Sequence, residues 1–92
     1  KLIVNDGAKK AILEKCTSLL PIGIVEVIND FKQGEVVSIC DENGIEFARG
    51  MVNYSSDECR KIAGSHSDDI LKTLGYKNYD AVITRDNITD LV

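Results

Sequence analysis

The sequence predicts a mixed α+β fold that is mainly β, with about five or six short, mostly antiparallel strands closed into a pseudo-barrel with three short helices. Three observations support this class. Runs of β-branched residues recur along the chain and are separated by turn residues. One separation contains Asn43-Gly44, a strong hairpin signal. Stretches with helical spacing are few and short, whereas a doubly wound parallel sheet alternates strands with longer helices. The 92 residues are expected to form one domain, 1–92.

The first elements are expected to be a strand, a helix and a second strand. Residues 2–4 are an apolar run suited to a strand. Residues 7–16 carry apolar side chains at helical spacing, and Asp6 can cap that helix. A proline ends the helix, so residues 18–23 are expected as a loop before a β-branched strand at 24–28.

The middle of the chain predicts a hairpin. Residues 35–40 and 45–49 are rich in apolar side chains and are expected to form two strands, one on each side of the Asn-Gly turn. Gly50 is expected to allow a kink or bulge where the second strand must curve. Phe31 is a predicted core residue.

The stretch 48–56 reads as a junction from strand through turn to helix. Ser55 is the expected N-cap, and Glu58 three positions later completes a capping box. The helix is predicted over 56–63, with Gly64 as the residue that ends it.

The last third predicts a short helix and one further strand. The helix begins near Ser67 and ends at Gly75, and its expected core residues are Ile70, Leu71 and Leu74. Residues 81–84 form the last convincing strand pattern, and Ile88 can add an edge strand.

Composition narrows the function classes. A net charge of −4 suits non-specific nucleic-acid binding poorly, although a local basic patch is compatible with it. No apolar run approaches the roughly 20 residues of a membrane span. The three cysteines, Cys16, Cys40 and Cys59, are odd in number and widely spaced, which argues against a disulfide framework and a zinc site. We expect free, largely buried thiols in a reducing cytoplasm.

No set of residues predicts an autonomous active site or a metal site. His66 is the single histidine and is expected to be a solvated loop residue. Asp68 and Asp69 suit the first turn of a helix, and residues 41–44 suit a hairpin turn better than a calcium loop. A phosphate-binding glycine motif is absent.

The basic residues are dispersed along the sequence. If the first helix, the loop at 21–23 and the last strand come together, then Lys9, Lys10, Lys15 and Arg85 form one basic surface. The alternative is a scattered set of cations in surface ion pairs.

Several motifs together resemble one known family. Residues 18–24, 34–37 and 48–56 are similar to PUA domains, the module named after pseudouridine synthases and archaeosine transglycosylases. Later motifs narrow the resemblance to the C-terminal PUA domain of bacterial glutamate 5-kinases; they are residues 53–56, 62–64, 67–70, 74–76 and 85–87. The match covers nearly the whole chain in the same order.

This resemblance implies a PUA pseudo-barrel that serves as a non-catalytic accessory or regulatory domain. The parent would be a cytoplasmic enzyme that transfers the γ-phosphate of ATP, with magnesium, to the γ-carboxyl of glutamate in proline biosynthesis. Its active site and its proline feedback site would lie in an N-terminal amino-acid-kinase domain outside this chain. The expected partner is that kinase domain, a homo-oligomeric parent is compatible with the resemblance, and this chain itself would need no cofactor.

The family also implies an alternative, an RNA-binding module. Other PUA domains bind RNA through the first helix, the glycine loop and the last strand, which correspond here to residues 7–16, 21–23 and 82–86. The candidate residues are Lys9, Lys10, Lys15, Pro21, Gly23 and Arg85. The chain has Cys16-Thr17 where the family commonly has Gly-Lys, and Thr84 where it commonly has His. Both departures weigh against RNA binding.

Overall fold

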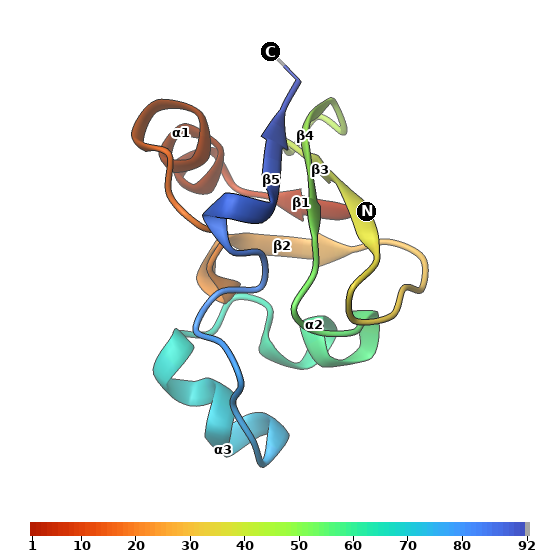
Figure 1. Cartoon of the computed structure of the whole chain (residues 1–92), viewed down its shortest axis with the longest axis vertical. Helices are drawn as coiled ribbons and strands as arrows, with labels where there is room; N and C mark the ends of the chain where they lie inside the picture. Colours follow the sequence, from red (N-terminus) through yellow and green to blue (C-terminus); the bar gives the residue numbers. More distant parts are fainter. Residues whose placement is uncertain (92) are drawn as a thin grey trace.

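A five-stranded sheet is the scaffold of the computed structural model, which describes residues 1–91 (Figure 1). The strands are β1 (Leu2–Val4), β2 (Ile24–Val27), β3 (Val36–Cys40), β4 (Glu46–Met51) and β5 (Ile88–Asp90). The helices are α1 (Asp6–Lys15), α2 (Ser56–Ile62) and α3 (Ile70–Leu74). Short 3-10 turns lie at Pro21–Gly23, Ser67–Asp69 and Arg85–Asn87. The predicted class, mixed and mainly β, is confirmed.

The sheet has the order β2-β1-β3-β4-β5. Only β1 and β3 pair in parallel among the described strands, and the β1–β2, β3–β4 and β4–β5 pairs are antiparallel. The predicted Asn-Gly hairpin joins β3 to β4, with Gly44 at a φ of 81°. Asp41 fixes this turn, because its Oδ1 accepts hydrogen bonds from the N–H groups of Asn43 and Ile45 at 2.9 and 3.0 Å.

Gly50 does not produce the kink or bulge that we expected. It pairs regularly with Val37 on one side and Ile88 on the other, and the irregularity in this ladder lies between Ile39 and Cys40. A Cβ atom at Gly50 would lie 2.7 Å from Cγ2 of Ile83. The glycine is therefore needed for close packing across the sheet face rather than for strand curvature.

Residues 81–84 are not the strand that their β-branched side chains predict. They form a single bridge, between Ile83 and Leu19. The side-chain amide of Asn53 donates to the carbonyl of Ala81 and to Oγ1 of Thr84, both at 3.0 Å. The backbone groups of Val82 and Ile83 bond to the backbone of Leu19 and Asn53 rather than to a continuous strand ladder.

The expected edge strand at Ile88 is confirmed as β5, which pairs with β4. The segment leading to it is anchored at Tyr79, because the buried hydroxyl of Tyr54 donates to the carbonyl of Tyr79 at 2.5 Å and accepts its N–H at 3.0 Å.

The helix ends are largely as predicted. Ser55 and Glu58 form the expected capping box of α2, and Gly64 follows that helix at a φ of 78°. The cap of α1 is Asn5 rather than Asp6, since the Asn5 side chain accepts the N–H of Ala8 at 2.8 Å.

The third helix is shorter than expected and less buried. It begins after the 3-10 turn Ser67–Asp69 and ends at Gly75, which has a φ of 82°. Ile70 is fully buried, but Leu71 is 56% exposed, so its assignment to the core was wrong. Figure 1 shows α3 at one end of the long axis, far from α1.

The core lies between the sheet and the helices. Its largest fully buried side chains are Tyr54, Phe47, Leu2, Ile12, Leu19, Ile39, Ile62, Ile70 and Ile83, and Phe31 is buried as predicted. Cys40 and Cys59 are buried, whereas Cys16 is exposed, which corrects the expectation for that thiol. None of the described helices is long and apolar enough to cross a membrane.

Candidate functional site

A groove lies between α1 and the segment that follows it. We call it the α1 groove, and it is lined by α1 and residues 17–23, with a volume of about 630 Å³. Helix α1 begins after its N-cap, Asn5, and ends at its C-cap, Cys16, which takes a left-handed conformation with a φ of 52°. This turn reverses the chain so that residues 17–23 run back alongside the helix.

The base of the groove depends on a close contact between Gly23 and α1. A Cβ atom at Gly23 would lie 2.6 Å from the Cβ of Ala8. The N–H of Asn5 donates to the carbonyl of Gly23 at 2.9 Å and holds the two segments together. Gly23 therefore lets the loop approach α1 closely, because it has no side chain.

The groove has apolar walls and hydrogen-bond donors around them. Ala8, Ala11, Leu20 and Ile22 supply the apolar surface. Leu20 is 42% exposed and Ile22 is 45% exposed, which is high for side chains of this type.

The polar lining residues of the α1 groove include Lys15, Thr17 and Ser18. Lys15 is exposed and forms no salt bridge with a residue in the range 1–91. Ser18 Oγ accepts the N–H of Arg85 at 2.9 Å, which leaves its hydroxyl hydrogen available to donate. No Asp or Glu is among the described residues that line the groove.

Lys9 does not contribute to the α1 groove. Its Nζ lies 2.9 Å from Oδ2 of Asp41 and 5.5 Å from the centroid of the Phe47 ring. The hydrogen bond from Lys9, followed by that from the N–H of Ile45, lowers the pKa of Asp41 below its usual value. Lys9 therefore ties α1 to the β3–β4 hairpin.

Arg85 is also held by internal contacts. Its guanidinium lies 3.3 Å from the carboxylate of Asp90, in two hydrogen bonds, and 3.4 Å from the carbonyl of Ile12. The hydrogen bonds that Arg85 donates to Asp90 raise the pKa of Arg85 above its usual value. Arg85 connects the 3-10 turn before β5 to α1, and its charge is balanced locally.

The sequence candidates thus fall at different places. Lys15 and Gly23 line the α1 groove. Lys10 lies on the other side of α1 in a second hollow that also includes Asp6 and Glu14. Pro21 is buried, and its carbonyl accepts the N–H of Gly64 at 2.8 Å. Sequence reasoning missed Thr17, Ser18, Leu20 and Ile22. The available signal was a predicted loop that mixes hydroxyl-bearing and apolar residues.

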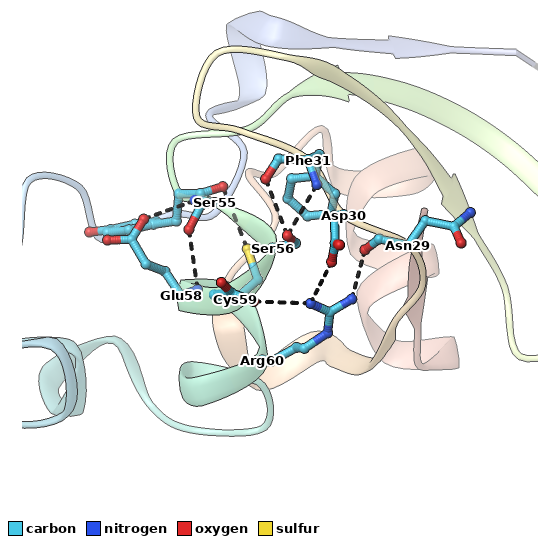
Figure 2. A network of polar contacts seen from close by, with 10 residues as sticks. Asn29, Asp30, Phe31, Ser55, Ser56, Glu58, Cys59 and Arg60 are labelled. Atoms are coloured by element: carbon cyan, nitrogen blue, oxygen red, sulfur yellow. Dashed lines mark hydrogen bonds and ion pairs between the residues drawn. The ribbon is translucent and has the colours of Figure 1, made fainter.

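A second cluster of polar contacts lies where residues 29–31 meet α2, and we call it the α2 junction (Figure 2). Ser56 Oγ accepts the N–H of Phe31 at 3.0 Å and donates to its carbonyl at 3.2 Å. Arg60 donates to the carbonyl of Asn29 at 2.7 Å and to the carboxylate of Asp30 at 3.0 Å.

The α2 junction has no chemically reactive group. Burial, with a smaller effect of Glu58, raises the pKa of the Cys59 thiol to about 12, so it stays protonated at neutral pH.

His66 is exposed, as expected. Within residues 1–91, no group of three or more His, Cys, Asp or Glu side chains is placed to hold a metal ion.

Comparisons with known proteins agree with this fold. The model of the PUA domain family matches residues 1–74. Two solved structures share the fold, a conserved PUA domain protein from Thermoplasma acidophilum (TM-score 0.60, 20% identity, 90% of this chain and 45% of that one) and a PUA domain from Aeropyrum pernix K1 (TM-score 0.63, 23% identity, 90% and 40%).

Two relatives by sequence are glutamate 5-kinases. Identity is 50% over 88 residues with that of Saccharophagus degradans, covering 96% of this chain and 24% of the relative. It is 49% over 90 residues with that of Caldanaerobacter subterraneus subsp. tengcongensis, covering 98% and 24%. The chain thus spans about a quarter of the length of these relatives. The expected resemblance is confirmed, and the chain belongs to the PUA domain family.

Proposed function

We propose that this chain is a non-catalytic accessory domain of a glutamate 5-kinase. The observation that carries the proposal is that nearly all of the chain aligns with about a quarter of such enzymes. The parent would phosphorylate the γ-carboxyl of glutamate in the cytoplasm, as a step of proline biosynthesis, and its kinase domain would be the partner of this domain in the same polypeptide.

We assign the ATP and magnesium of that reaction to the kinase portion of the parent. The sequence of this chain has no phosphate-binding glycine motif, and its described residues include no group of three or more His, Cys, Asp or Glu side chains placed to hold a metal ion. The domain would therefore act on the kinase portion through contacts, by tuning its activity, its response to proline or its assembly.

Truncation of the full-length parent tests this role. A variant that ends before Lys1 should differ from the whole enzyme in kinetic constants, in inhibition by proline or in oligomeric state. Identical behaviour in all three measurements would refute the regulatory role. Glutamate and ATP incubated with the 92-residue chain alone should give no phosphate transfer.

RNA binding is a second candidate, and one observation favours it. Lys10 and Lys15 are exposed on α1 and form no salt bridge with a described residue. If they contact phosphate, structured RNA should bind near 50 mM salt and more weakly as salt rises. Lys10→Glu with Lys15→Glu should then weaken binding, whereas Lys72→Glu on α3 is the matched control. Absence of binding at low salt would eliminate this candidate.

A further inference from the structure

We propose that the α1 groove is the docking surface for an acidic, apolar segment of the kinase portion of the same polypeptide. This inference rests on the proposed function and deepens it, because it names the surface through which the accessory domain would contact its partner. The occupant is a stretch of protein in which an apolar side chain lies next to a carboxylate.

The apolar part of the occupant follows from the exposed side chains at the groove. Leu20 and Ile22 leave 42% and 45% of their surface in contact with solvent. They lie beside Ala8 and Ala11, so the exposed apolar surface is continuous with a hollow rather than scattered. A polypeptide can fill the hollow and also cover its rim, whereas a small ligand seated in the hollow would leave the rim exposed.

The acidic part of the occupant follows from the charge of the lining. The chain has 15 acidic and 11 basic residues, yet the groove is lined by Lys15 and by no carboxylate among the described residues. The hydroxyl groups of Thr17 and Ser18 lie at the same surface. These groups donate hydrogen bonds, and a carboxylate accepts them.

Protein fits this lining better than a nucleic-acid backbone does. Each phosphate along RNA is neutralised by a cation, and affinity depends on the number of such contacts. At this surface Lys15 is accompanied by apolar side chains, while Lys9 and Arg85 are already paired with Asp41 and Asp90. The groove therefore offers apolar contact with one accessible cation.

A covalent tether makes a shallow surface of this kind sufficient. The relatives are about four times as long as this chain, which covers 24% of their length. Two sites joined by a short linker meet at an effective concentration in the millimolar range. A contact made by two apolar side chains and one cation would be weak between separate molecules, but tethering can keep it populated.

Photo-crosslinking in the full-length parent tests the proposal directly. A photo-reactive phenylalanine analogue replaces Ile22 in one variant and Leu71 in another. Leu71 is a matched control, because it is 56% exposed and lies on α3, outside the residues that line the groove. We expect position 22 to crosslink within one polypeptide to a kinase-portion peptide that contains an apolar residue beside Asp or Glu. Position 71 should not crosslink to that peptide.

The other outcomes of this experiment each overturn the proposal. They are no crosslink at position 22, a crosslink to RNA, a crosslink to a second copy of the chain, and a crosslink to a peptide without acidic residues. Truncation separates this proposal from the accessory role. If removing the domain alters the kinase but position 22 crosslinks to nothing, the role stands and the docking surface is wrong.

Amide hydrogen exchange in the full-length parent gives a second readout. Leu20→Asp with Ile22→Asp places carboxylates against the acidic occupant at side chains that are 42% and 45% exposed, and circular dichroism checks that the variant is folded. We expect exchange in residues 17–23 to become at least about tenfold faster than in the parent, with matching deprotection of the partner peptide. Leu71→Asp should leave both segments unchanged. Equal exchange in all three proteins would refute the docked state.

Discussion

The α2 junction and the α1 groove differ in how completely their side chains are partnered. At the α2 junction, Ser56 and Arg60 bind the backbone of residues 29–31, and Ser55 caps the helix (Figure 2). At the α1 groove, Leu20 and Ile22 are partly exposed, and Lys15 has no described ion-pair partner. One region closes the fold, whereas the other leaves surface available for contact.

The largest difference in stability between the two regions should appear when one isoleucine in each is truncated to alanine. Ile62→Ala on α2 removes a fully buried side chain and should lower the free energy of unfolding by about 2–5 kcal/mol. Ile22→Ala, at a side chain that is 45% exposed, should cost less than about 1 kcal/mol. Denaturant unfolding of both variants measures the difference, and equal losses would contradict the contrast between the regions.

Gly23→Ala addresses the one tightly packed part of the α1 groove. The added methyl group would lie 2.6 Å from the Cβ of Ala8, so helix and loop must separate, at a cost of about 1–3 kcal/mol.

Gly23→Ala with Ala8→Gly restores the space at that contact. The two changes should show a favourable coupling energy of about 1 kcal/mol or more in a double-mutant cycle. Additive losses would mean that the contact between Gly23 and Ala8 does not set the position of the loop.

Ser56→Ala tests the partnering at the α2 junction. It leaves the buried N–H of Phe31 without its acceptor and should destabilise the domain by about 1–3 kcal/mol. Thr17→Ala, at an exposed hydroxyl of the α1 groove, should change stability by less than about 0.5 kcal/mol. Comparison of the two unfolding midpoints provides the measurement.

The smallest predicted effect is on how the free energy of unfolding depends on acidic pH. It concerns the ion pair between Lys9 on α1 and Asp41 at the β3–β4 hairpin. Because Lys9 and then the N–H of Ile45 lower the pKa of Asp41 in the folded state, ionised Asp41 stabilises the domain above its unfolded pKa of about 3.8. That stabilisation is lost as the pH falls through the lower, folded pKa.

Lys9→Met removes the largest cause of this shift and should make the stability less dependent on pH below 4. Unfolding curves between pH 6 and about 2 measure the slope. Parallel curves for the two proteins would show that the ion pair between Lys9 and Asp41 does not contribute.

Local signals in the sequence predicted most of the scaffold. The capping box of Ser55 and Glu58 is complete within four residues, and the Asn-Gly turn fixes its own hairpin. Residues 81–84 were misread because their backbone groups bond to Leu19 and Asn53, which are distant in sequence, instead of forming a strand ladder. Gly50 was misread because its neighbour, Ile83, also comes from a distant segment.

The candidate site was harder to predict from the sequence, because it too depends on contacts between residues that are distant in sequence. Lys9 and Arg85 have suitable charges, but Asp41 and Asp90, which neutralise them, are brought near by folding. The apolar residues Leu20 and Ile22 resembled ordinary loop residues until the left-handed turn at Cys16 placed their segment alongside α1. Pairing and exposure are properties of the folded chain.

The pairing of β4 with β5 has a consequence for synthesis of the chain. Residues 46–51 leave the ribosome well before residues 88–90, so β4 is an uncovered sheet edge during that interval. An uncovered edge invites pairing with other chains, and charged side chains discourage it. Glu46 and Arg49 lie on β4, 2.9 Å apart in an ion pair, and they supply that protection until β5 arrives.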